Sequence, residues 1–176
     1  FLMNNKFLLT LFFFIFVLNP ISVKANTTFA YLNIELLIKN SKAIQVMNKE
    51  LNLINTNNQK KFIDEEKKIN KERKNLIKKK NVLSSNEFNK EVQELESRIK
   101  VYNEFKKKTI NELNSMKTIA DNNFSINLTK ILESYKEKNS IDFIMNKNSI
   151  LLGTKKFDIT NDIIIIFNNQ IKKINF

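Results

Sequence analysis

The chain has one proline and one glycine among its 176 residues, and both stand near the ends, at Pro20 and Gly153. These two residue types interrupt α-helices most strongly, proline by removing a backbone donor and glycine by its backbone entropy. From about residue 36 to residue 135, the only break in the apolar pattern is the polar cluster Ser84-Ser85-Asn86. The sequence therefore predicts two long helices joined at this cluster.

The chain also has no cysteine and no histidine. A disulfide is thereby excluded, as are the common ligands of zinc, copper and haem iron and the usual general base near neutral pH. Catalysis by carboxylates or lysines is not excluded by composition, but no arrangement of such residues resembles a catalytic site. We therefore predict a protein that is not an enzyme, holds no metal or cofactor, and works by binding a partner.

The N-terminal segment has the form of a secretory signal peptide. Lys6 precedes an apolar run of twelve residues, 7–18, and a polar stretch then ends at Ala25. A permanent membrane span needs about 20 apolar residues, so an uncleaved anchor is the less favoured alternative. We predict export and cleavage after Ala25, so that residues 1–25 are removed. Loss of Lys6 and Lys24 would lower the formal net charge from +12 to +10.

Apolar residues in both predicted helices recur at coiled-coil spacing. The first series is Ile44, Met47, Leu51 and Ile54, followed at intervals of seven by Phe62, Ile69, Leu76 and Leu83. The eleven residues from Leu51 to Phe62 form a stutter that locally relaxes a left-handed supercoil. The second series is Phe88, Val92, Leu95, Ile99, Tyr102, Ile110, Leu113, Met116, Ala120, Phe124, Leu128, Ile131 and Tyr135. Two stripes that flank one break predict an antiparallel hairpin.

This hairpin is expected to form an arm of residues 44–135 with its tip near residues 81–87. Ser84 and Glu87 have the spacing of a capping box, which predicts that the return helix starts at Ser84. Between Ile54 and Leu83 the arm has few apolar residues, so we expect the distal part to be marginally stable and able to bend. An ordinary rigid coiled coil is the alternative.

The arm is strongly basic. Residues 60–80 hold ten basic and four acidic side chains, an excess of +6. The candidate binding residues on the first helix are Lys60, Lys61, Lys67, Lys68, Lys71, Arg73, Lys74, Lys78, Lys79 and Lys80; those on the second are Arg98, Lys100, Lys106, Lys107 and Lys108. Such a surface attracts acidic proteins or polyanions, although it can also serve only as a solvated helix face. No nucleic-acid-binding motif is present, so binding to DNA is expected to be incidental.

The two ends of the mature chain, residues 26–43 and 136–176, are predicted to form a discontinuous β-containing body. Phe29 to Asn33 has the pattern of a strand, and a helix is expected from Leu36 onward. Residues 141–145 and 149–152 are predicted to be two more strands, and Thr160 is expected to cap a last helix. So small a sheet is marginal alone, and we expect self-association to cover its edges.

Four segments in this order carry a resemblance to a known family: "FAYLNIELLIKNSKA", "VLSSNEF", "SIDFIMNKNSILL" and "FDITNDII". With the signal peptide and the Lys/Glu-rich hairpin, they make the chain similar to the Skp/OmpH family of periplasmic chaperones. The resemblance implies an α+β, mostly α, homotrimer in the periplasm, whose arms project from a shared body around a cavity. It also implies capture of unfolded outer-membrane β-barrel proteins without ATP, and their delivery for membrane assembly.

On this resemblance, the oligomerisation body would contain Phe29, Tyr31, Phe143, Ile150, Ile159 and Ile163. The basic arm residues would attract clients, and Phe62, Ile69, Val92 and Ile99 would pack the hairpin or face the cavity. Some family members are proposed to bind lipopolysaccharide, so anionic lipid is a further candidate partner, without a residue-by-residue match. A structural coiled-coil protein of the envelope and a basic coiled coil that binds polyanions are the alternatives. The chain continues past the usual family end through Gln170 to Phe176.

Overall fold

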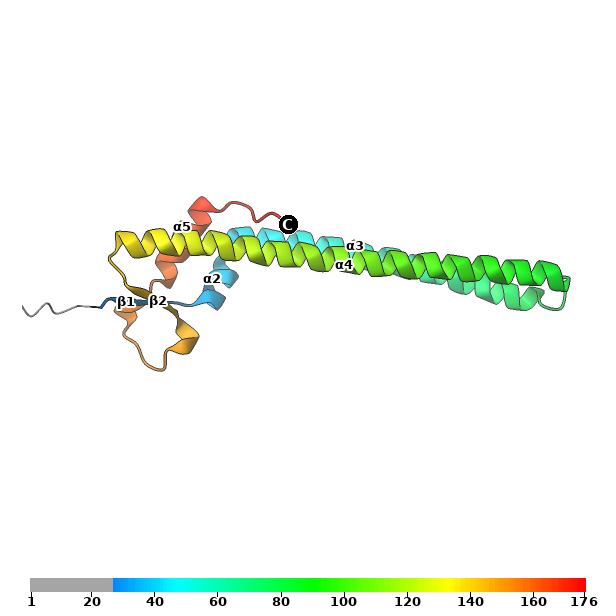
Figure 1. Ribbon diagram of the computed structural model, residues 1–176, viewed down its shortest axis with the longest axis horizontal. Helices are drawn as coiled ribbons and strands as arrows, with labels where there is room; N and C mark the ends of the chain where they lie inside the picture. The colour runs from blue at the N-terminus through cyan, green and yellow to red at the C-terminus, as the bar shows by residue number, and fades with distance from the viewer. Residues whose placement is uncertain (1–26) are drawn as a thin grey trace, which may run out of the picture.

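The computed structural model describes residues 27–176, so the predicted signal peptide lies outside the described residues. In chain order the elements are β1 (Phe29–Leu32), α2 (Ile34–Asn40), α3 (Lys42–Lys79), α4 (Ser85–Lys138), β2 (Phe143–Asn146), the 3₁₀ turns η1 (Lys147–Ser149) and η2 (Lys155–Phe157), and α5 (Thr160–Gln170). Figure 1 shows α3 and α4 side by side as a long hairpin that projects from a small body. The predicted mostly helical architecture is confirmed.

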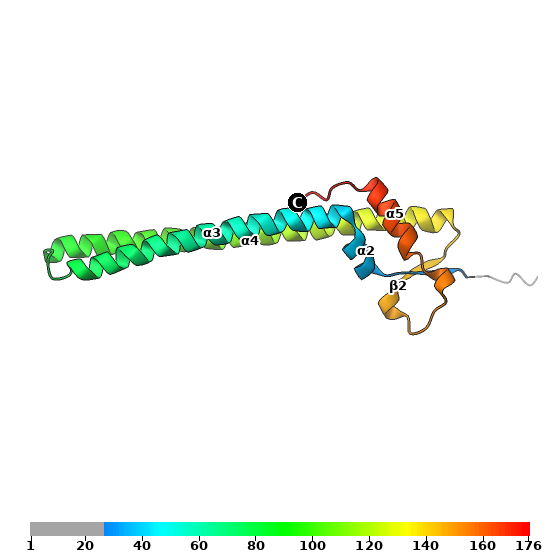
Figure 2. The same cartoon turned by 180° about the vertical axis from the view of Figure 1, so that it is seen from behind.

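The long helix expected from Leu36 onward is in fact two helices. The first starts earlier, at Ile34, because the Asn33 side chain accepts a hydrogen bond from the Leu36 N–H and caps it. It ends at Asn40, and Ser41 adopts an extended backbone conformation, from which its hydroxyl caps α3 through the Ile44 N–H. The chain turns at this buried serine, so the short α2 packs against α5 rather than continuing the arm (Figure 2).

The apolar seam of the hairpin is divided into two clusters. The first runs from the body out to Leu51 on α3 and Leu113 on α4, while the second consists of Phe62, Ile69 and Tyr102 with partly buried neighbours. The predicted stutter separates them, and there the polar residue Asn58 is partly buried. The distal arm therefore depends on few buried apolar side chains.

One predicted seam residue lies elsewhere. Ile110 is 44% exposed, whereas its neighbour Thr109 is buried between α3 and α4. Steps of four and three residues from Tyr102 lead to Lys106, Thr109 and Leu113, so the helical repeat places Thr109 in the seam. The sequence-based prediction chose Ile110 because it is the more hydrophobic residue, although the heptad position belongs to Thr109.

The tip of the hairpin follows the predicted capping box. Helix α3 ends at Lys79 and α4 begins at Ser85, with Ser84 as its N-cap. The Ser84 hydroxyl accepts from the Glu87 N–H at 3.4 Å, and the Glu87 carboxylate accepts from the Ser84 N–H at 3.1 Å. These reciprocal bonds satisfy backbone donors that the start of a helix would otherwise leave unpaired, and so fix where α4 starts.

The two strands pair in parallel, with Phe29 opposite Phe143 and Leu32 opposite Asn146. Parallel neighbours need a long crossover connection, and here the whole hairpin provides it. On the other side of β1, Tyr31 bridges Asp158, and the Ile159 N–H donates to the Tyr31 carbonyl at 3.0 Å. The segments that precede and follow the hairpin therefore meet at β1.

A compact apolar core extends from this sheet, past α5, to the root of the arm. Its most completely buried side chains are Leu32, Leu37, Ile163, Phe167 and Ile174. The Phe167 ring of α5 lies 5.7 Å from the Phe124 ring of α4, centroid to centroid. At the other end of α5, the Tyr135 hydroxyl donates to Asp162 at 2.8 Å. Helix α5 thereby joins the body to the root of the arm.

The third predicted strand, residues 149–152, does not form. Ser149 ends the turn η1, and Leu151 and Leu152 are almost completely exposed. A strand needs a partner edge, and β1 is already flanked by β2 on one side and by Asp158 on the other. The outer edge of β2 stays unpaired within the described residues, because the chain turns directly after β2 into η1, where the Asn146 side chain accepts from the Asn148 N–H at 3.1 Å.

The predicted cap at Thr160 is also wrong. Helix α5 begins at Thr160 itself, and the Asp158 carboxylate accepts from the Thr160 N–H at 3.0 Å. The Thr160 hydroxyl instead accepts from the Asn33 N–H at 2.9 Å. Thr160 therefore ties the start of α5 to the turn between β1 and α2.

Candidate functional site

Polar contacts join α3 to α4 along the distal arm, where the apolar seam is thin. Arg98 on α4 binds two glutamates of α3, Glu65 at 2.7 Å and Glu72. Glu66, the residue after Glu65 on α3, accepts from the Lys106 ammonium at 2.8 Å and from the Tyr102 hydroxyl at 2.6 Å. These charged and hydrogen-bonded groups supplement the few apolar contacts between the helices.

The same contacts shift the pKa values of the two central carboxyl groups. The hydrogen bond from Arg98, followed by that from Lys68, holds the pKa of Glu65 below its ordinary value of 4.5. The bonds from Lys106 and then Tyr102 lower the pKa of Glu66 in the same way. Burial, together with the bond to Glu66, raises the pKa of the Tyr102 hydroxyl. Both glutamates are therefore charged in the folded arm at neutral pH.

We expect the distal arm to open in acid. A carboxyl group whose pKa is lowered by folding stabilises the folded state above its unfolded pKa, here about 4.5, and loses this effect as the pH falls through the lower folded value. Because the chain has no cysteine, spin labels can be placed at Asn75→Cys and Lys90→Cys on opposite helices. The distance between these labels should lengthen and broaden below about pH 4.5.

The double variant Glu65→Gln, Glu66→Gln is the control for this measurement. Its arm should already be more open at neutral pH, and the label distance should change much less on acidification. An unchanged distance in the original chain between neutral pH and pH values well below 4.5 would contradict the role assigned to Glu65 and Glu66.

The predicted basic residues divide into two groups. Five of them form ion pairs, two with a glutamate of their own helix (Lys68 and Lys108) and three across the hairpin: Lys79, Arg98 and Lys106. The other ten form no ion pair within residues 27–176: Lys60, Lys61, Lys67, Lys71, Arg73, Lys74, Lys78, Lys80, Lys100 and Lys107. The first group stabilises the arm, and the second presents open positive charge.

Four lysines of the second group form a row on α3. Lys67, Lys71, Lys74 and Lys78 recur at steps of four, three and four residues, which places them on one helix face. All four are exposed, and the exposed side chain of Ile77 lies beside them in the same shallow depression. We call these four residues the lysine row. They offer a positive surface with an apolar side chain next to it.

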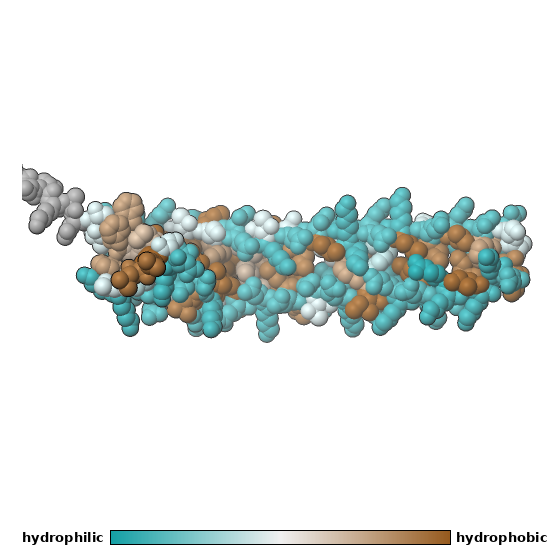
Figure 3. Space-filling view, turned by 90° about the horizontal axis from the view of Figure 1, so that it is seen from below, coloured by the Kyte–Doolittle hydropathy of each residue, from teal (hydrophilic) through white to brown (hydrophobic). Residues whose placement is uncertain are grey.

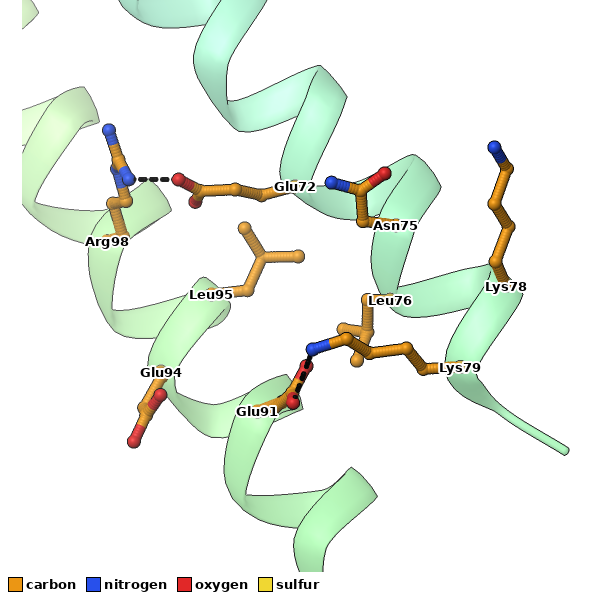
Figure 4. A pocket seen from close by; sticks show the side chains of 9 residues that line it. All are labelled: Glu72, Asn75, Leu76, Lys78, Lys79, Glu91, Glu94, Leu95 and Arg98. Carbon is orange, nitrogen blue, oxygen red and sulfur yellow. Dashed lines mark hydrogen bonds and ion pairs between the residues drawn. The ribbon is translucent and has the colours of Figure 1, made fainter. Parts of the chain in front are cut away.

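Two clefts between α3 and α4 combine charged walls with apolar side chains. Near the tip, a cleft of about 670 Å³ lies over Leu76 and Leu95, and Figure 4 shows these leucines between the ion pairs Arg98–Glu72 and Lys79–Glu91. Closer to the body, a cleft of about 460 Å³ contains the exposed side chains of Val101 and Phe105. Each can contact an apolar segment between charged groups.

Exposed apolar side chains continue along the arm outside these clefts. Figure 3 shows brown patches along the middle of the arm, with hydrophilic side chains projecting at both edges. Ile63, Ile77, Val82, Ile110 and Ile119 are among the exposed members. Scattered apolar contacts of this kind can hold an apolar partner weakly at many points.

The body has an apolar surface of its own. The rings of Phe29 and Phe143 stack on adjacent strands with their centroids 5.8 Å apart, and both are largely exposed. Beside them, a cleft of about 560 Å³ is lined mainly by the apolar side chains of Phe29, Tyr31, Met145, Ile150, Leu152 and Phe157. Gly153 also lines this cleft, where a Cβ would lie 3.3 Å from the Tyr31 ring. We call this surface the body cleft.

The six residues predicted for the body therefore occupy different positions. Phe29, Phe143 and the partly buried Ile150 lie at the open surface, whereas Tyr31, Ile159 and Ile163 are buried within the chain. Sequence reasoning did not select Met145, Leu152 or Phe157. Their signal was present in the dense apolar pattern of residues 143–157.

Within residues 27–176, no group of three or more potential ligand side chains could hold a metal ion. In the same residues, no helix has both the length and the apolar character needed to cross a membrane. The surface features that remain are the lysine row, the mixed clefts of the arm and the body cleft. All three are suited to binding another macromolecule.

Comparison with known proteins gives a consistent result. Residues 28–166 match the family model described as outer membrane protein (OmpH-like). The fold is similar to a crystal structure from Caulobacter crescentus CB15 assigned as an OmpH-like outer membrane chaperone, with a TM-score of 0.77 and 14% identity over 86% of this chain and 90% of that one. No curated protein matches the sequence.

Proposed function

Because the chain belongs to the OmpH-like outer membrane protein family, we propose that it is an ATP-independent periplasmic holdase. Its clients are unfolded outer-membrane β-barrel proteins, whose aggregation it prevents before they are delivered for membrane assembly. The resemblance inferred from the sequence is confirmed at the level of the family. The holdase activity itself is supported chiefly by the arm, on which open lysines alternate with exposed apolar side chains.

The physical requirement for such a holdase is weak binding at many points. A client held by one strong contact would need an energy source for its release, whereas several weak contacts give tight retention while each can exchange rapidly. Exposed residues such as Ile63, Ile77 and Phe105 provide contacts of this kind. The lysine row increases the rate of encounter with acidic segments, an effect that salt reduces.

We also propose that three copies assemble through their bodies. An isolated two-stranded sheet is marginally stable, and an apolar surface such as the body cleft is commonly covered by another chain. In this arrangement the exposed Leu151 and Leu152 would lie against a neighbouring copy. Three arms around one space would multiply the weak contacts available to a single client.

The proposal is tested by diluting a urea-unfolded outer-membrane β-barrel protein into buffer with residues 26–176 at physiological salt. We expect light scattering to be suppressed near one trimer per client, with no nucleotide present. Unchanged scattering with a folded, helical protein would contradict the holdase function. It would favour a structural coiled coil of the envelope.

Variants of the lysine row make the test specific. Replacing Lys67, Lys71, Lys74 and Lys78 by glutamine should slow client capture several-fold at low salt, and the difference should disappear at high salt. The matched control replaces four exposed lysines outside the row, Lys130, Lys138, Lys147 and Lys155, and should retain the original rate. Equal slowing by both sets would indicate a net-charge effect and remove the special role of the row.

A further inference from the structure

The last six residues, 171–176, lie outside the segment that matches the family model. They follow α5 as an irregular segment and run back along the root of the arm (Figures 1 and 2). Ile174 is only 1% exposed and belongs to the same buried cluster as Leu51 of α3 and Ala120 of α4. Ile171 and Phe176 pack against this cluster. We call residues 171–176 the tail.

Two polar contacts hold the tail, one on each helix of the arm. The Asn123 side-chain amide of α4 donates to the main-chain carbonyl of Asn175 at 2.9 Å. The Lys173 ammonium lies 3.3 Å from the Glu50 carboxylate of α3. The bond from Asn123 recognises peptide backbone, which every extended segment presents. The surface beneath the tail is therefore not restricted to the tail sequence.

The surface around these two contacts is wider than the tail. On α3, Val46 and Leu53 stand four and three residues from Glu50, and on α4, Ile119 and Ile126 have the same relation to Asn123. Such spacing places each apolar pair on the same helix face as its polar residue. These four apolar side chains are 45–60% exposed although the tail is in place. We call the six residues, with the buried cluster between them, the root groove.

The tail is bound in a way that permits exchange. Only Ile174 is fully buried, and the ion pair of Lys173 is exposed, so it contributes little. Binding of the tail also fixes six residues and so costs conformational entropy. This cost is at least as large as the free energy gained by burying Ile174. A competing segment with better-placed apolar side chains can therefore displace the tail.

We propose that the root groove is a binding site for an extended peptide with apolar side chains two or three residues apart. The chain's own tail, with apolar residues at 171, 174 and 176, occupies this site until such a peptide displaces it. The identity of the competitor rests on the proposed function. It is a strand-forming segment of an unfolded β-barrel client, which has apolar residues at a similar spacing.

The test uses a fluorescent synthetic peptide with the tail sequence IKKINF. Its binding to residues 26–176 is compared with its binding to a chain that ends at Gln170, by fluorescence anisotropy. We expect at least tenfold tighter binding to the shortened chain, because the site is then vacant. A peptide with aspartate at the position of Ile174 should not bind. Absence of binding to the folded shortened chain, or equal binding to both chains, would overturn the proposal.

Two variants keep the test informative if the shortened chain loses stability. Ile174→Asp in the full chain retains all six residues and should open the groove to the peptide, with Lys172→Asp as the exposed control. Asn123→Ala in the shortened chain should weaken peptide binding several-fold. If Ile174→Asp leaves peptide binding unchanged in a folded protein, the tail only straps the arm to the body. Because no client is present, this result is independent of the holdase assay.

Discussion

Replacement of Phe167 by alanine is expected to lower the free energy of unfolding by about 3–5 kcal/mol, the range found when a buried phenylalanine is truncated. Phe167 is fully buried, and its ring contacts Phe124 across the junction of α5 and α4. The substitution leaves a cavity where the body joins the arm. Urea unfolding followed by circular dichroism, at one fixed protein concentration, measures the loss.

The matched control is Phe105→Ala, which removes the same atoms from a half-exposed position on the arm. Its ring has an edge contact with Phe62, so we expect a loss of only about 1 kcal/mol. If the loss for Phe167→Ala is as small as that expected for Phe105→Ala, the core around α5 contributes little to stability. That result would contradict the packing described for the body.

The second large effect is expected on self-association. Phe143→Asp places a carboxylate on the exposed ring pair of β1 and β2, beside the body cleft. A charge buried in an apolar interface is costly, and loss of a central aromatic contact typically costs 2 kcal/mol or more, which corresponds to about 30-fold weaker binding. Light scattering coupled to size-exclusion chromatography should show the mass falling from trimer towards monomer.

Phe105→Asp provides the comparison, because it introduces the same charge on the arm, away from the body. It should leave the mass unchanged. If Phe143→Asp is folded and keeps the mass of the original chain, the body cleft is not the association surface. A monomeric original chain at the same concentration would remove the proposed trimer altogether.

The long helices and their tip could be predicted from local sequence alone. Absence of proline and glycine, the heptad steps and the reciprocal pair Ser84 and Glu87 all act within a few residues. The prediction failed where distant residues decide the structure. Thr160 has the form of an N-cap residue, but its hydroxyl accepts from the Asn33 N–H, 127 residues earlier in the chain.

In the candidate site, too, features that depend on local sequence could be predicted, whereas contacts between distant residues could not. The excess of lysines on α3 is visible in the sequence, and the lysine row follows from helical spacing. The partners of Arg98 and Lys106 were not visible, because their glutamates lie 26–40 residues away on the other helix. The sequence-based prediction therefore assigned Arg98 and Lys106 of α4, which bind the two helices together, to the open positive surface.

The parallel pairing of β1 with β2 also sets the order in which the protein can fold. The Thr28 N–H donates to Asp142, 114 residues further along the chain. The hairpin, in contrast, is built from contacts within each helix and from two helices joined by one short connection. Contacts between such distant residues form slowly unless an intervening structure brings the ends together. Helices α3 and α4 should therefore form and pair first during synthesis, and β1 should pair with β2 last. Synthesis interrupted before Phe143 leaves a complete hairpin that has no sheet and therefore lacks the surface proposed for association with other copies.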